Sequence, residues 1–233
     1  MYAEWIRMQH NWPENPGLTQ DEYDTLLDRF NPVNFDADAW VSEAKNAGMK
    51  YMLITAKHHD GFALWPSEVS DYNVVDATPF GRDILGELRE ACDKHGIRLG
   101  FYYSHWQDWH HPGGVRPPWP EYSDLPLLQQ PGEDEFENYW QEKCLPQVRE
   151  LIENYHPAFL WFDTWTDALY INEARLDELI NLVRDLDPEC LINSRIGTTW
   201  GHSKGDELVD FLSMGDNSFP DRTIERPWET SGT

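Results

Sequence analysis

The stretch "LWFDTW", residues 160–165, ends an apolar run on a carboxylate. Leu160, Trp161 and Phe162 are typical of the end of a buried strand, and Asp163 follows where the chain should leave the core. A carboxylate at the carboxyl end of a buried strand, between two tryptophans, either caps the next segment or takes part in chemistry. The pattern on both sides of it indicates the fold that this strand belongs to.

Short apolar runs alternate with longer amphipathic ones along the chain. Buried strands joined by helices of this length are typical of parallel βαβ units. Neither GxGxxG nor GxxxxGK[ST] occurs, which favours a (β/α) barrel over a dinucleotide-binding fold. No repeat, low-complexity tract or linker divides the chain, so we expect one α/β domain. The predicted helices span 36–48, 81–96, 133–155 and 172–188, and the predicted strands span 49–56, 97–104, 158–163, 189–196 and 207–216.

Unusual polar residues follow the predicted strands. In a barrel, the chemistry gathers at the carboxyl ends of the strands. The motifs at those ends are KHHDG, YYSHW, DTW, NSR and GDN.

The composition excludes some partners. A net charge of −24 and a pI near 4.5 make nucleic acids and anionic membranes poor partners. Twelve tryptophans weakly favour a carbohydrate site, because aromatic faces stack on sugar rings. The three cysteines are far apart and form no CxxC pair, so we expect neither a disulfide framework nor a zinc site.

Asp163 is the best candidate for a nucleophile. Its aromatic neighbours would limit water, and nearby donors could keep it ionised. Retaining glycoside hydrolysis needs a second carboxyl group about 5–5.5 Å away, and inverting hydrolysis needs one about 6.5–9.5 Å away. Spacing in the sequence does not choose among the candidates for that second group, which are Asp60, Asp216, Asp221, Glu225 and Glu229.

The run His58-His59-Asp60 suggests either metal ligation or hydrogen bonding to a polyhydroxyl ligand. A metal needs three or four convergent donors, and neighbouring residues of an extended chain point in different directions. No HxH or HExxH motif accompanies the pair. We therefore favour hydrogen bonding to a ligand.

Ordered motifs carry a resemblance to a known family. The stretch 35–104, from "FDADAWVSEAKNAGMK" to "GFYYS", resembles the α-L-fucosidases of glycoside hydrolase family 29. The stretches "YWQEKCLPQVRELIENYHPAFLWFD", "LINSRIG" and "GDN…PWETSGT" continue the resemblance over nearly the whole chain. Its specificity comes from the ordered series EW, KHHDG, YYS, WFD, NSR and WE.

The resemblance implies a retaining double displacement on α-L-fucosides that uses no cofactor. Asp163 matches the family nucleophile. Glu229, in "PWETSGT", matches the segment that carries the acid/base, and Glu225 stays a weaker candidate. The implied partner is a fucosylated oligosaccharide or glycoconjugate, and no metal, nucleic acid or membrane is implied.

The resemblance also implies a set of sugar-binding residues. Tyr103 matches a substrate-facing tyrosine, although its neighbour Tyr102 could take that role. Trp161 would provide an apolar wall for the C6 methyl group of fucose. The full set implied to bind substrate is Glu4, Trp5, His58, His59, Tyr103, Trp161 and Arg222.

Two departures from the family pattern concern the ends of the chain. The His-Trp-Gly motif of the family's first barrel strand is absent, and the chain stops four residues beyond Glu229. We therefore expect residues 1–233 to form a single, partial (β/α)8-like catalytic barrel that lacks its first and last strands, with the usual C-terminal β-sandwich absent. We expect the full-length parent to be active and this chain to be weakly active or inactive. The usual localisation of the family favours an extracellular or periplasmic location for the full-length parent.

Three other functions stay open. The first is a non-catalytic fucose-binding partial barrel. The second is another glycosidase specificity, such as that of an α-galactosidase. Comparing the hydrolysis of fucosides with that of galactosides would distinguish it from a fucosidase. The third is a metal-dependent isomerase or hydrolase that uses His58, His59 and Asp163, which sensitivity to a chelator would reveal.

Overall fold

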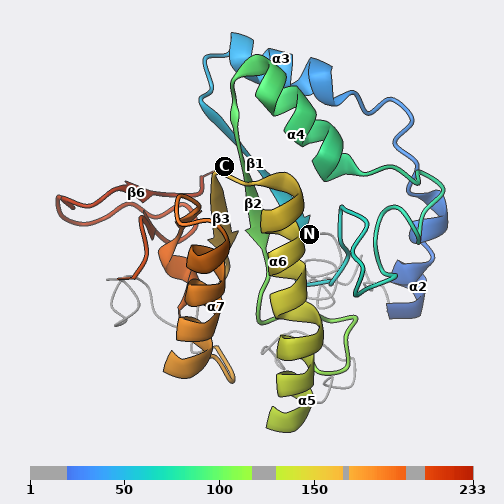
Figure 1. Ribbon diagram of the computed structural model, residues 1–233, viewed down its shortest axis with the longest axis vertical. Coiled ribbons are helices and arrows are strands. Elements are labelled where there is room, and N and C mark those ends of the chain that lie inside the picture. Colours follow the sequence, from blue (N-terminus) through green and yellow to red (C-terminus); the bar gives the residue numbers. More distant parts are fainter. Residues whose placement is uncertain (1–19, 117–129, 165–167, 198–207, 233) are drawn as a thin grey trace, which may run out of the picture.

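Parallel strands in sequence order form the centre of the molecule (Figure 1). The computed structural model describes residues 20–116, 130–164, 168–197 and 208–232. A four-stranded sheet has the order β1-β2-β3-β4, and β5 pairs with β6. The strands are β1 (Tyr51–Lys57), β2 (Arg98–Tyr103), β3 (Phe159–Phe162), β4 (Leu191–Ile192), β5 (Leu212–Ser213) and β6 (Trp228–Glu229).

All the strand pairs are parallel, which confirms the predicted α/β class with a parallel sheet. An isolated parallel bridge between Asn193 and Phe211 links the end of β4 to the start of β5. The strands therefore follow one another in space as they do in sequence. In a (β/α) barrel each strand lies beside the one that precedes it in the sequence. In a dinucleotide-binding sheet the strand order instead reverses at the middle of the sheet, as in the order 3-2-1-4-5-6.

Three of the long helices begin at a side-chain cap. Asp36 accepts a hydrogen bond from Ala39 N, Asp83 from Gly86 N, and the third cap is Asn172. These bonds satisfy backbone groups that a helix start leaves without partners. The helices are α2 (Gln20–Asp24), α3 (Ala37–Asn46), α4 (Ile84–His95), α5 (Glu133–Tyr139), α6 (Leu145–Tyr155) and α7 (Glu173–Leu186).

The predicted helix 133–155 contains a π-helical turn, Trp140–Cys144, between α5 and α6. Such single turns change which residues face inward. Here Lys143 is buried, although lysine belongs on the outer face of an amphipathic helix.

The predicted strands 189–196 and 207–216 are right in position and too long. Only Leu191–Ile192 pairs as β4, and the 3-10 turn Ser194–Ile196 follows it. Asn193 ends the strand because its side chain bonds to the backbone N–H and C=O of Phe162 on β3.

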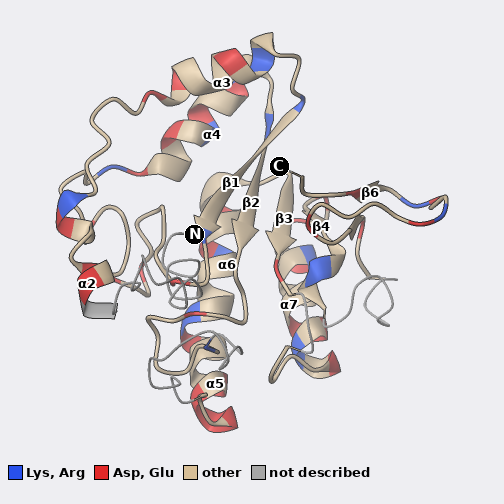
Figure 2. Cartoon of the chain, turned by 180° about the vertical axis from the view of Figure 1, so that it is seen from behind, with Lys and Arg blue, Asp and Glu red and all other residues tan. Residues whose placement is uncertain are grey.

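The helices α6 and α7 lie side by side along the sheet (Figure 1) and cover an apolar core. Acidic residues recur along the exposed sides of α3, α4, α5 and α7 (Figure 2). At the end of the described sheet, Tyr51 and Leu53 of β1 are 54% and 39% exposed. In the described part of the chain, no helix has the length and apolar character needed to cross a membrane.

Candidate active site

Asp163 follows β3, whose four residues are all buried. Its own side chain is also buried, and both carboxylate oxygens have close neighbours. The Tyr102 hydroxyl donates a 2.5 Å hydrogen bond to Oδ2, and an Arg195 guanidinium nitrogen lies 2.5 Å from Oδ1. Burial raises the pKa of the Asp163 carboxyl, whereas Arg195 and Tyr102 oppose that rise. The site thus holds a poorly hydrated carboxylate beside the groups that favour its charged form.

Arg195 is a site residue to which the sequence analysis gave no role. It is buried in the 3-10 turn after β4, and it also pairs with Asp216 at 2.8 Å. Its guanidinium lies 4.7 Å from the ring centroid of Trp161. The signal in the sequence was the motif NSR at a strand end, but only the turn shows that the arginine reaches Asp163.

Glu229 joins the same cluster from β6. Its Oε1 accepts hydrogen bonds from the Trp161 indole N–H and from Ser213 Oγ, the latter at 2.7 Å. Ser213 is also its register partner in the β5–β6 pair. Trp161 in turn stacks on Tyr102 with ring centroids 5.3 Å apart. Trp161 and Tyr102 therefore connect the two carboxyl groups that were expected to act together.

The two histidines lie on the other side of Tyr102. His58 stacks on its ring at 5.2 Å, and His59 Nε2 lies 3.7 Å from Asp163 Oδ2. Burial lowers the pKa of His58 to about 3 and holds the pKa of His59 well below its usual range. Both imidazoles are therefore neutral at neutral pH.

The structure does not bring Tyr103 to this cluster. Successive residues of a strand point to opposite faces, so Tyr102 faces Asp163 and Tyr103 faces the helices. The Tyr103 hydroxyl donates to Gln147 Oε1 on α6 at 2.9 Å and is fully buried. Tyr102, the neighbour considered beside it, occupies the position at the carboxylate.

The remaining predicted binding residues and the weaker acid/base candidate are either exposed or outside the described residues. Arg222 and Glu225 are exposed in the segment between β5 and β6. Glu4 and Trp5 fall outside the residues that the structure describes. Trp106 was not predicted, yet its indole N–H donates to the backbone carbonyl of Asp163 at 2.8 Å.

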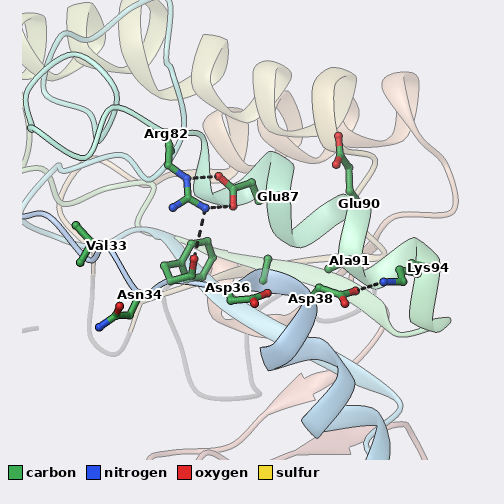
Figure 3. A pocket seen from close by; sticks show the side chains of 11 residues that line it. Val33, Asn34, Asp36, Asp38, Arg82, Glu87, Glu90, Ala91 and Lys94 are labelled. Carbon is green, nitrogen blue, oxygen red and sulfur yellow. Dashed lines mark hydrogen bonds and ion pairs between the residues drawn. The ribbon is translucent and has the colours of Figure 1, made fainter.

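No group of three or more His, Cys, Asp or Glu side chains within the described ranges is arranged to hold a metal ion. A separate pocket between the start of α3 and α4 contains none of the cluster residues (Figure 3). Two ion pairs lie among its lining residues, Arg82 with Glu87 and Lys94 with Asp38. The described residues best suited to chemistry are therefore those around Asp163.

This arrangement can perform nucleophilic or general-base chemistry on a neutral, hydroxyl-rich ligand. Asp163 supplies the carboxylate, and Glu229 supplies a second carboxyl group on the far side of Trp161. The neutral histidines can exchange hydrogen bonds with hydroxyl groups, and the indole ring offers an apolar surface.

Comparisons with known proteins agree with one another. The α-L-fucosidase family model matches residues 1–233. The mouse tissue α-L-fucosidase is 30% identical over 95% of this chain, which covers 45% of the mouse protein. A solved α-L-fucosidase from Lactobacillus casei in complex with its α-L-fucose product is 40% identical, with a TM-score of 0.78, over 98% of this chain and 68% of that one. An α-L-fucosidase structure from a Vibrio strain has a TM-score of 0.81 at 33% identity, over the whole of this chain and 38% of that one. The chain thus spans less than half the length of the mouse relative.

Proposed function

We propose, since this chain belongs to the α-L-fucosidase family, that it carries the catalytic site for hydrolysing α-L-fucosidic linkages in fucosylated glycans with retention of configuration. The observation that carries this proposal is the environment of Asp163. A buried carboxylate at a strand end, held by Arg195 and Tyr102, is suited to attack on a sugar, and it caps none of the helices in the described part of the chain.

Asp163 is the proposed nucleophile. It would attack the anomeric carbon of the fucoside and form a glycosyl-enzyme ester, which water then hydrolyses. Arg195 and Tyr102 hold its two oxygens in place and favour the ionised form, which is the reactive one. Arg195 and Tyr102 are both buried with Asp163, so their interactions with it are little screened by water.

Glu229 is the proposed acid/base. It would protonate the leaving oxygen in the first step and deprotonate the attacking water in the second. Hydrogen bonds from Trp161 and Ser213 to one oxygen leave the other oxygen of the carboxyl group for this exchange. Glu225 lacks such support, because it is exposed between β5 and β6.

His58 and His59 are proposed to bind the hydroxyl groups of the sugar, and Trp161 to face its C6 methyl group. Tyr102 takes the role that the sequence favoured for Tyr103, because its hydroxyl reaches Asp163. Glu4, Trp5 and Arg222 stay in the proposal on the family resemblance alone.

We also propose that the domain is a (β/α)8-like barrel of which these residues form part. The sequential order of the parallel strands supports this, as do the exposed apolar side chains of Tyr51 and Leu53 on β1. Strands that closed the barrel would cover such an edge.

Hydrolysis of 4-nitrophenyl α-L-fucoside by this chain, beside a version extended at both ends, tests the proposal. We expect the extended protein to release nitrophenol and its Asp163→Asn variant to do so at least about a thousandfold more slowly. Fucose binding without hydrolysis in either length would contradict the proposal and favour the non-catalytic fucose-binding alternative. Faster cleavage of the matching galactoside would contradict the sugar specificity.

A further inference from the structure

A buried amide side chain joins the end of β3 to β5. Asn193, which follows β4, is fully buried. Its Oδ1 accepts a hydrogen bond from the backbone N–H of Phe162 at 2.8 Å. Its Nδ2 donates to the Phe162 carbonyl at 3.0 Å and to Ser213 Oγ at 3.2 Å. Phe162 immediately precedes Asp163, so this amide connects the strand that carries the proposed nucleophile to β5.

The backbone of Phe162 determines which way the Asn193 amide faces. A backbone N–H only donates and a carbonyl oxygen only accepts, so the amide oxygen must face the first and the amide nitrogen the second. One hydrogen of Nδ2 bonds to the Phe162 carbonyl, and the other is then directed at Ser213 Oγ. Ser213 therefore accepts a hydrogen bond from Asn193 and keeps its own hydroxyl hydrogen for another partner.

That other partner is Glu229. Ser213 Oγ lies 2.7 Å from Glu229 Oε1, and the two residues are register partners in the β5–β6 pair. The hydroxyl has a single hydrogen, and an amide N–H already points at its oxygen, so this hydrogen goes to the carboxylate. The hydrogen bonds thus run in one direction, from Asn193 to Ser213 and from Ser213 to Glu229.

Two donors share one oxygen of Glu229. Oε1 accepts hydrogen bonds from Ser213 Oγ and from the Trp161 indole N–H. A carboxylate oxygen has about two lone-pair sites, so these donors fill Oε1 and leave Oε2 as the atom that can hold a proton. The hydrogen bonds therefore select the oxygen through which the carboxyl group exchanges a proton.

We propose that Ser213 is a positioning residue whose hydroxyl is oriented by Asn193, so that Glu229 holds its catalytic proton at Oε2. This inference rests on the proposed function, in which Glu229 is the acid/base. It adds the two residues that orient this carboxyl group and the oxygen through which the group acts.

The backbone on both sides holds Ser213 in place. Asp210 N donates to Ile192 O at 2.9 Å, and Ser194 N donates to Phe211 O at 3.0 Å, which joins the end of β4 to the residues before β5. At the next step the backbone N–H of Ser213 donates to Ser194 Oγ at 3.0 Å, a side chain in place of a strand carbonyl. A rigid frame of this kind lets a single hydroxyl group fix the position of a carboxyl group.

Neutron crystallography of the extended protein after deuterium exchange reads the directions of these bonds. We expect the Ser213 deuteron on the line to Glu229 Oε1 and an Asn193 Nδ2 deuteron on the line to Ser213 Oγ. A Ser213 deuteron directed at Asn193, or a deuteron bound to Glu229 Oε1, would overturn the inference. This measurement uses the unaltered protein, so it does not depend on the folding of a variant.

The leaving group of the substrate tests what the hydroxyl does in catalysis. The substrate with a poor leaving group is fucose α(1,6)-linked to N-acetylglucosamine, the ligand of a solved relative. In Ser213→Ala we expect kcat/KM for this disaccharide to fall about tenfold and kcat/KM for 4-nitrophenyl α-L-fucoside to fall much less, because only the sugar needs a proton to leave.

Ser194→Ala is the matched control for this comparison. It removes a hydrogen bond to the backbone of Ser213 and leaves the Ser213 hydroxyl in place, so any loss of kcat/KM should be the same for both substrates. An equal dependence on the leaving group in the two variants would show that loosening β5 is enough, and it would overturn the positioning role of the hydroxyl.

The Glu229→Ala variant separates this inference from the proposed function. If it lowers kcat/KM equally for both substrates, Glu229 is not the acid/base, and that part of the proposed function fails while the hydrogen-bond directions stand. If Glu229→Ala depends on the leaving group and Ser213→Ala does not, the proposed function stands and the positioning role of Ser213 is wrong.

Discussion

Trp161 and Glu229 are 68 residues apart in the chain and share a hydrogen bond from the indole N–H to the carboxyl group. The same indole stacks on Tyr102 and lies under Arg195, the two residues that hold Asp163. One tryptophan therefore serves both as a wall of the proposed sugar site and as the support of its proposed acid/base.

Trp161→Phe keeps an aromatic wall and removes the donor to Glu229. We expect kcat/KM to fall about 10- to 100-fold, since hydrogen bonds to charged groups contribute about 1.5–3 kcal/mol. Trp140→Phe is the matched control, because that indole donates to Glu178 on α7 at 2.8 Å. Equal losses in the two variants, measured by steady-state kinetics, would show that the Trp161 bond has no special role.

Glu229→Ala should slow the cleavage of natural linkages far more than that of 4-nitrophenyl fucoside, because nitrophenolate leaves without needing a proton. A disaccharide of fucose α(1,6)-linked to N-acetylglucosamine, the ligand in a solved relative, serves as the demanding substrate. We expect at least about a hundredfold loss on the disaccharide and partial rescue of the nitrophenyl reaction by azide. Glu225→Ala should leave both rates near normal. If Glu225→Ala shows the leaving-group dependence instead, the acid/base has been assigned to the wrong residue.

Tyr102→Phe removes a hydrogen bond to ionised Asp163, and losing it raises the pKa of that carboxyl further. The ionised form of the proposed nucleophile then persists only at higher pH, so the acid limb of the kcat/KM profile should move toward higher pH. Tyr103→Phe removes a hydroxyl of the next residue, which bonds to Gln147, and should leave the acid limb in place. A pH–rate profile of both variants makes the comparison, and an acid limb that shifts only in Tyr103→Phe would reverse the assignment.

Asp163→Asn should slow turnover at least about a thousandfold and should make the stability of the protein less dependent on pH than that of the unaltered chain. The folded pKa of Asp163 is raised above its unfolded value of 3.8, so the aspartate's contribution to stability is present below 3.8 and is lost as the pH rises through the folded pKa. The amide avoids that loss, while Arg195 keeps its pair with Asp216. Chemical denaturation from acidic to neutral pH should show the free energy of unfolding of the unaltered chain falling relative to that of the Asn variant as the pH rises. A constant difference at every pH would refute the linkage.

Gln107→Met should stabilise the fold by about 1–3 kcal/mol, the cost of burying a polar group without a partner. The Gln107 amide is fully buried, and neither of its polar atoms has a hydrogen-bond partner in the described part of the chain. Gln147→Met is the matched control, because that equally buried amide bonds to Tyr103 and Ser67 and should lose stability. Denaturation midpoints of the two variants should therefore move in opposite directions, and a destabilised Gln107→Met would contradict the prediction.

The sequence predicted the parallel α/β fold because its signals are local. Apolar runs mark the strands, and caps such as Asp36, Asp83 and Gly96 mark the ends of helices. The point at which β4 ends was less predictable. Asn193 ends that strand through hydrogen bonds to Phe162 on β3, which is 31 residues away in the chain.

The candidate site was predictable only in part for the same reason. Asp163 and Glu229 stand in motifs, and the structure connects them through Trp161. The choice between Tyr102 and Tyr103 depends on which face of β2 points inward, which two adjacent tyrosines do not reveal. The contact between Arg195 and Asp163 depends on the 3-10 turn, and a motif of three letters does not specify a turn.

The β5–β6 pair has two residues in each strand, whereas β3 is buried along its whole length. A short pair opens at a lower free-energy cost than the sheet beside it, so warming should release Glu229 while Asp163 is still in place. The proposed hydrolysis, which needs Glu229, would then stop at a temperature where circular dichroism still reports an intact fold. It would return on cooling because the rest of the fold had not unfolded. The upper temperature limit of the proposed activity would thus be set by one strand of two residues, and stabilising the rest of the molecule would not raise it.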